Sequence, residues 1–170
     1  MKVAFYGGQT AGIVVLLTLL AKRYSVNYVI PEDDGIKNIA LGLQLPIYPK
    51  NLLNNEKFIN NLKNNIDLLI CCHGRKILTP QLVNTVKCIN IHPCLYKYKG
   101  ARPIKRLIRD KNPKASVASH YMTEQVDLGK VIIERFINIP GVESKTEAEI
   151  YHDLYPLYES VIIETLNKLG

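Results

Sequence analysis

The sequence has little cysteine and no apolar run long enough to cross a membrane. Its four cysteines among 170 residues are too few for a disulfide-rich secreted domain, and none forms a Cys-x-x-Cys metal pattern. We therefore expect Cys71, Cys72, Cys88 and Cys94 to be buried, reduced thiols of a cytoplasmic protein. The longest apolar run, residues 11–21, is well short of the about 20 residues that a membrane helix needs. It predicts a buried helix, and we expect no membrane partner.

Repeats, low-complexity tracts and linkers are absent as well. With about 150 residues per domain as a guide, residues 1–170 form a single domain. The composition, 47% hydrophobic and 22% charged, is typical of a folded globular protein and excludes a disordered chain. Lys and Arg total 22 against 15 for Asp and Glu, which gives a net charge of +7. This surplus favours anionic ligands such as phosphates, nucleotides, a polyglutamated ligand or RNA, without selecting among them.

Apolar runs and helical periodicities alternate along the chain, as in strand-helix-strand units. Strands are predicted at residues 3–6, 26–30, 67–71, 87–91, 115–121 and 130–139. Helices are predicted at residues 11–22, 54–65 and 103–109, and a C-terminal helix follows a capping box at Thr146 and Glu149, with a kink at Pro156. The pattern predicts a single α/β domain with a Rossmann-like, doubly wound, mostly parallel sheet and helices on both faces.

In such a sheet, ligands bind beyond the carboxyl ends of the strands. We therefore expect the chemistry just after Tyr6, Cys72 and Ile91. Asn90 and His92 lie two residues apart on a predicted strand, so their side chains share one face. This pair could simply cap a strand end by bonding loop backbone, or it could serve a reaction.

Asp127, in the loop between the last two predicted strands, completes a set of residue types suited to acid-base chemistry. Asn supplies a donor to a developing oxyanion, His exchanges protons near neutral pH, and Asp orients the imidazole and stabilises its cation. On its own, Asp127 also fits an ordinary turn aspartate. No Ser or Cys nucleophile motif accompanies the three, and Cys94 is a weak candidate. Direct attack by a bound substrate therefore fits better than a covalent intermediate.

The residues Asn90-Ile91-His92-Pro93, then Lys97 to Ala101, then Ser119 to Asp127 resemble the folate-dependent formyltransferase family. This family includes glycinamide ribonucleotide formyltransferase, the catalytic domain of methionyl-tRNA formyltransferase, sugar N-formyltransferases and 10-formyltetrahydrofolate hydrolase. The resemblance implies that the co-substrate is 10-formyltetrahydrofolate and that no metal takes part. It also implies that Asn90 stabilises the oxyanion, His92 handles the proton and Asp127 orients His92.

The same resemblance suggests further binding residues. The folate-binding residues are expected to be Arg75, Lys76, Ile77, Leu78, Glu124 and Val126. The acceptor-binding residues are expected to be Gly7, Gly8, Gln9, Lys99, Gly100 and Arg102. The first turn departs from the family's Gly-x-Gly-Ser-Asn phosphate loop, and its glycines also fit a purely conformational role. The segment after Pro93 is one residue shorter than its counterpart and lacks a proline, and the basic run around Arg102 also fits a solvated helix face.

The expected acceptor is a small primary amine on a phosphorylated ribose or a nucleotide-linked sugar. A tRNA substrate is less favoured, because the methionyl-tRNA branch carries a second, C-terminal β-domain and this sequence ends with its last predicted helix. Hydrolysis of the formylfolate is the next alternative, and a binding module without turnover is the least favoured. His73 and Tyr151 are predicted to be structural, and His120, on the strand that leads to Asp127, to lie behind the catalytic residues rather than to react itself. The sequence gives no reading of the oligomeric state.

Overall fold

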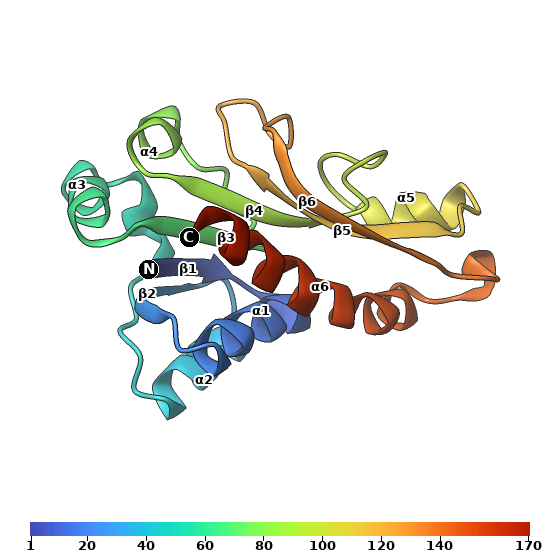
Figure 1. Cartoon of the computed structure of the whole chain (residues 1–170), viewed down its shortest axis with the longest axis horizontal. Helices are drawn as coiled ribbons and strands as arrows, with labels where there is room; N and C mark the ends of the chain where they lie inside the picture. The colour runs from blue at the N-terminus through green and yellow to red at the C-terminus, as the bar shows by residue number, and fades with distance from the viewer.

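One six-stranded sheet organises the computed structural model, which describes residues 1–170 (Figure 1). The strands are β1 (Lys2–Gly7), β2 (Ser25–Pro31), β3 (Leu68–Cys72), β4 (Cys88–Pro93), β5 (Lys114–Tyr121) and β6 (Val131–Asn138). Their order is β2-β1-β3-β4-β5-β6, with β1 to β4 parallel to one another and β5 antiparallel to both of its neighbours, β4 and β6. The predicted α/β, mostly parallel sheet is confirmed, and all six predicted strands are present.

Helices cover both faces of the sheet, as the alternation of elements predicts. They are α1 (Gln9–Ala21), α2 (Asp34–Gly42), α3 (Glu56–Asn65), α4 (Pro80–Thr85), α5 (Pro103–Arg109) and α6 (Glu147–Leu169), with 3-10 turns at Lys50–Asn54 and Val142–Ser144. Helices α1, α2 and α6 lie on one face, and α3 and α4 lie on the other (Figure 1). None of the helices combines the length and apolarity that a membrane crossing requires.

Side chains of the central strands alternate between two apolar clusters, one on each face. Along β1, Val3 and Phe5 pack with α1 and α6, whereas Ala4 and Tyr6 pack with α3 and α4. Both faces are therefore buried, which explains why these strands are continuous apolar runs. All four cysteines are buried and unpaired, as predicted.

The C-terminal helix begins with the predicted capping box. The Thr146 hydroxyl accepts the Glu149 amide N–H, and the Glu149 carboxylate accepts the Thr146 N–H at 2.7 Å. The helix continues through Pro156 as one element to Leu169. It packs against α1 and against β5 and β6, so it covers this part of the sheet.

Candidate active site

A cavity of about 830 Å³ lies at the carboxyl ends of β1, β3 and β4, where the sheet topology predicts a ligand site. Tyr6 from β1, Cys71 from β3 and Asn90 from β4 line its floor. Loops 73–78, 100–103 and 122–127 form its walls. The three residues predicted to be catalytic, Asn90, His92 and Asp127, all line this one cavity.

The pairing of β4 with β5 places the polar side chains. Asn90 and His92 project on one face of β4, while Ile91 between them enters the opposite core cluster. The antiparallel register sets His120 of β5 directly opposite Asn90. His92 and His120 are both buried, although polar side chains are costly to bury without partners.

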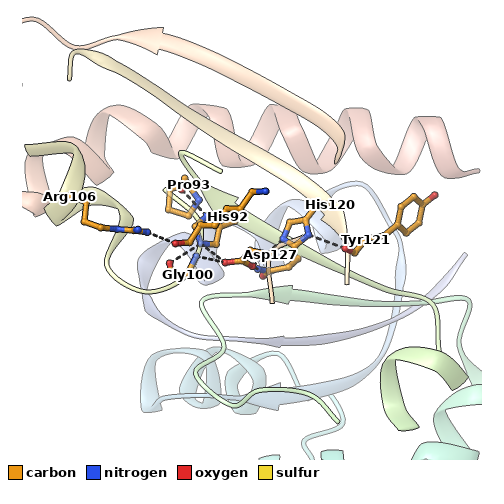
Figure 2. A network of polar contacts seen from close by, with 9 residues as sticks. His92, Pro93, Gly100, Arg106, His120, Tyr121 and Asp127 are labelled. Carbon is orange, nitrogen blue, oxygen red and sulfur yellow. Dashed lines mark hydrogen bonds and ion pairs between the residues drawn. The ribbon is translucent and has the colours of Figure 1, made fainter. Parts of the chain in front are cut away.

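Asp127 supplies the partner that these buried groups share (Figure 2). One carboxylate oxygen lies 3.1 Å from His92 Nε2 and accepts the Gly100 amide N–H at 2.8 Å. The other lies 3.4 Å from His120 Nε2 and 3.5 Å from the Asn90 amide nitrogen, which donates to it. This carboxylate, within 3.5 Å of four nitrogen atoms, gathers residues from β4, β5 and two loops into one cluster.

The pKa of Asp127 lies well below the ordinary range of a carboxyl group. Burial opposes ionisation, but the close contacts with His120 and His92, the charge of His92 and the Gly100 amide outweigh it. Asp127 is therefore an anion throughout the neutral and mildly acidic range. Its backbone adopts a left-handed conformation with φ of 56°, which aspartate tolerates better than most residues other than glycine.

Both histidines face oxygen atoms at both ring nitrogens. His92 Nδ1 lies 2.8 Å from the Pro93 carbonyl, and its Nε2 lies 3.2 Å from the Gly100 carbonyl as well as near Asp127 (Figure 2). His120 Nδ1 lies 2.9 Å from the Tyr121 carbonyl, and its Nε2 approaches Asp127 without an aligned hydrogen bond. The carboxylate and the loop carbonyls thus hold both rings in place at the cavity.

The loop that carries Asp127 has no room for a side chain at Gly129. A Cβ there would lie 1.7 Å from the Tyr121 carbonyl oxygen. We expect Gly129→Ala to displace this loop and to lower the free energy of unfolding by about 1–3 kcal/mol, as overpacking does. Urea unfolding tests this, with Gly42→Ala as the matched control. Gly42 ends a helix with nothing within 4 Å of an added Cβ. Equal stability of the two variants would contradict the geometry.

All six residues predicted to bind folate line the cavity: Arg75, Lys76, Ile77, Leu78, Glu124 and Val126. The side chains of Ile77 and Val126 are 72% and 54% exposed, which is unusual for aliphatic residues. The amide and carbonyl groups of Ile77 and Leu78 make no hydrogen bond within the protein. This wall therefore offers apolar surface together with unpaired backbone donors and acceptors.

A buried polar clamp, which sequence reasoning missed, holds this wall in place. Glu32, just after β2, accepts the Tyr6 hydroxyl at 2.6 Å, the Lys50 ammonium at 2.7 Å and the Arg75 amide at 3.1 Å. The Tyr6 oxygen in turn accepts the Lys76 amide at 2.8 Å. These contacts join residues up to 70 positions apart, so no local motif announces them.

The residues predicted to bind the acceptor are only partly brought together. Gln9, Gly100 and Arg102 line the cavity, while Gly7, Gly8 and Lys99 are not among its lining residues. A Cβ on Gly7 would lie 2.3 Å from the Cys72 carbonyl oxygen, so close packing of the backbone requires a glycine there.

Part of the basic run around Arg102 is engaged within the protein. Arg106 donates to the Lys99 carbonyl and lies over the Tyr98 ring. Lys105 pairs with Glu147 at 3.5 Å. These two side chains of α5 therefore contact the loop 97–102 and the start of α6. Arg102 lies at the edge of the cavity.

His73 and Tyr151, which were predicted to be structural, also line the cavity. His73 follows β3 directly, and its Nε2 lies 2.8 Å from the hydroxyl of the fully buried Tyr158. Burial, followed by the nearby charge of His92, lowers the pKa of His73 to about 4. His73 is thus a neutral imidazole in a site that holds two other histidines close to a carboxylate. Its position after a buried strand was the sequence signal that pointed to the site.

The lowered pKa of His73 predicts a pH-dependent stability. Between about pH 4 and pH 6.5 the unfolded chain binds a proton at this residue that the folded chain does not, so stability falls as the pH falls. We expect His73 to contribute about 2 kcal/mol to the loss of unfolding free energy between pH 7 and pH 5. Urea unfolding at both values should show a smaller loss in His73→Asn. The exposed His152→Asn serves as control, and identical losses in the two variants would contradict this reading.

Both the sequence and the fold resemble those of known proteins. Residues 3–166 match the family model described as formyl transferase. The methionyl-tRNA formyltransferase of Thermosipho melanesiensis is 28% identical over 183 residues, covering 99% of this chain and 59% of the relative. The chain therefore spans about three fifths of the length of such curated relatives.

Solved structures share the fold. Phosphoribosylglycinamide formyltransferase from Bacillus halodurans aligns with a TM-score of 0.82 at 20% identity, over 99% of this chain and 95% of that one. A sugar N-formyltransferase from Shewanella sp. aligns with a TM-score of 0.78 at 21% identity, over 98% of this chain and 68% of that one. Because the family model covers nearly the whole sequence, the chain belongs to the formyl transferase family.

Proposed function

We propose that this chain transfers the formyl group of 10-formyltetrahydrofolate to a primary amine by direct attack. The observation that carries the proposal is the cluster of Asn90, His92 and Asp127 in one cavity, with the carboxylate 3.1 Å from His92 Nε2. An amide donor, a proton-exchanging ring and a fixed anion are the groups that attack on a formamide requires. Membership of the formyl transferase family supplies the class of reaction.

The cavity fits the proposed co-substrate. Its volume of about 830 Å³ lies within the usual range for sites that enclose small organic ligands. The unpaired backbone groups of Ile77 and Leu78 suit the polar edge of a heterocycle, and Leu78, Val83 and Met122 offer apolar contacts to its faces. Arg75 and Lys76 provide positive charge for the carboxylates of a glutamate tail. When bound, the formylfolate supplies the formyl group that is transferred.

The residues of the chain have distinct parts in the transfer. A bond forms between the amine nitrogen and the formyl carbon, the bond from that carbon to N10 of the folate breaks, and one proton moves from the amine to N10. Asn90 donates to the formyl oxygen as negative charge builds on it; its present contact with Asp127 is long, at 3.5 Å, and is readily exchanged. His92 exchanges the proton, and Asp127 stabilises its charged ring.

For the acceptor we propose a small amine that carries a phosphate or a nucleotide, held partly by Arg102. The net charge of +7 and the position of Arg102 at the cavity support this choice. Methionyl-tRNA is the second candidate, because the matching curated relatives include the methionyl-tRNA formyltransferase of Thermosipho melanesiensis. That activity belongs to proteins of which this chain spans about three fifths.

The experiment that tests the proposal follows the absorbance of 10-formyltetrahydrofolate with purified protein. The acceptors are glycinamide ribonucleotide, a nucleotide-linked amino sugar and initiator methionyl-tRNA, each compared with a reaction that lacks amine. We expect consumption that depends on one of these amines. Consumption without amine would identify a hydrolase, and tight folate binding without any consumption would identify a binding module; either result would overturn the proposed transfer.

A further inference from the structure

The end of the cavity beside β1 and β3 has a different chemistry from the Asp127 cluster. Gln9 and His73 follow these two strands, which are paired directly, and Tyr151 from α6 lines the same region. The His73 and Tyr151 rings meet edge to face with centroids 5.4 Å apart. The mechanism proposed above uses none of these side chains, so their placement calls for a separate explanation.

The contact with Tyr158 determines which nitrogen of His73 carries the proton. Tyr158 is fully buried, and its hydroxyl has His73 Nε2 as its one polar partner, at 2.8 Å. If Nε2 carried the proton, the hydroxyl hydrogen of Tyr158 would be buried without an acceptor. Tyr158 therefore donates to Nε2, and the proton of the neutral ring resides on Nδ1. This nitrogen makes no hydrogen bond within the protein, and it is open to the cavity that His73 lines.

The amino end of α1 carries a carboxylate where a helix would otherwise attract a phosphate. Asp33 Oδ2 accepts the Gln9 amide N–H at 2.6 Å, and Asp33 Oδ1 accepts the Ile36 N–H at 3.2 Å, so Asp33 bridges the first turns of α1 and α2. A Cβ on Gly8 would lie 2.6 Å from the same Oδ2. The chain thus places its own anion against the turn, and a second anion there would meet like charge.

We propose that the acceptor presents an uncharged, oxygen-bearing group to this end of the cavity, where His73 donates its Nδ1–H to that oxygen and Asp33 repels a phosphate. The inference rests on the proposed function, and it narrows the acceptor to an amine whose phosphates lie away from α1, toward Arg102. A sugar hydroxyl and an aminoacyl ester carbonyl both satisfy this chemistry. A ribose phosphate anchored at the first turn does not.

The first test does not depend on catalysis. Amide spectra of nitrogen-15-labelled protein are recorded during titration with inorganic phosphate at constant ionic strength. We expect the Gln9 and Thr10 signals of the wild type to stay in place, and those of Asp33→Asn, which keeps an oxygen for the Ile36 cap, to shift saturably. Asp34→Asn, which removes a charge one residue away, should behave as the wild type does. Saturable binding to the wild type, or no binding to Asp33→Asn, would overturn the exclusion of phosphate.

The second test concerns His73. Side-chain spectra should show its proton on Nδ1 in the wild type and a mixture of tautomers in Tyr158→Phe; a proton on Nε2 in the wild type would overturn the assignment.

His73→Phe should raise the KM for the accepted amine by about tenfold and leave the KM for formylfolate unchanged. A fall in kcat alone would contradict acceptor recognition. A nucleotide-linked amino sugar and initiator methionyl-tRNA, compared as acceptors, distinguish the hydroxyl from the ester. If no amine supports turnover, the proposed function fails, while the phosphate and tautomer results still decide this inference.

Discussion

Asn90→Ala is expected to lower the rate of formyl transfer by about 100- to 1000-fold, the usual effect of removing one oxyanion donor. Asn90 lies on the rigid strand β4, opposite His120, and its amide points at Asp127 in the cavity. Its one polar contact in the protein is long, so loss of the side chain removes little that holds the fold together. The effect should therefore fall on kcat, with the KM for formylfolate nearly unchanged.

Asn138→Ala is the matched control for this variant. Asn138 ends β6 as an exposed residue away from the Asp127 cluster, so its loss should change neither transfer nor folding. Thermal unfolding of both variants separates a catalytic effect from a structural one. Near wild-type turnover in Asn90→Ala, with the fold intact, would show that the oxyanion is stabilised elsewhere.

Asp127→Asn is expected to lower transfer by about 100- to 10,000-fold, the range that general acid-base catalysis supplies. The carboxylate lies within 3.5 Å of His92, His120 and Asn90 and accepts the Gly100 amide. An amide in its place carries no charge and turns a donor group toward at least one of these partners. His92 then loses the anion that stabilises its charged ring.

The dependence of activity on pH provides a second test of the role of Asp127. Because the pKa of Asp127 lies well below the ordinary range, wild-type activity should show no loss from protonation of this carboxylate in mildly acidic buffer. Asp34→Asn, an exposed residue at the start of α2, controls for the loss of one negative charge. Asp127→Asn within about threefold of wild-type activity would contradict the central role of this carboxylate.

The strands and the pair of Asn90 and His92 could be predicted because their signals are local, whereas Asp127 was indicated by its residue type together with the resemblance to the formyltransferase family. Continuous apolar runs identify strands that are buried on both faces, and the two-residue spacing of Asn90 and His92 places them on one face of β4. Helices α2 and α4 were not predicted. They have nine and six residues, and their main signals are the N-caps Asp33 and Thr79, whose side chains accept Ile36 and Leu82 amides.

The end of the cavity beside β1 and β3 depends on contacts that are distant in sequence. His73 meets Tyr158 across 85 positions, and Asp33 meets the Gln9 amide across 24. Neither pair belongs to a motif. In the sequence, a histidine that follows a strand and an aspartate that precedes a helix each have an ordinary local explanation. Only the pairing of β1 with β2 and β3 and the packing of α6 bring these groups to one place.

The most direct test of the proposed reaction follows the formyl carbon itself. Protein is incubated with 10-formyltetrahydrofolate labelled at that carbon and with each candidate amine, and the products are analysed by mass spectrometry. We expect the label in an N-formyl amine with wild-type protein, and at least 100-fold less of it with Asn90→Ala and with Asp127→Asn. Label that appears only as free formate, or equally in the wild type and both variants, would contradict formyl transfer at this cluster.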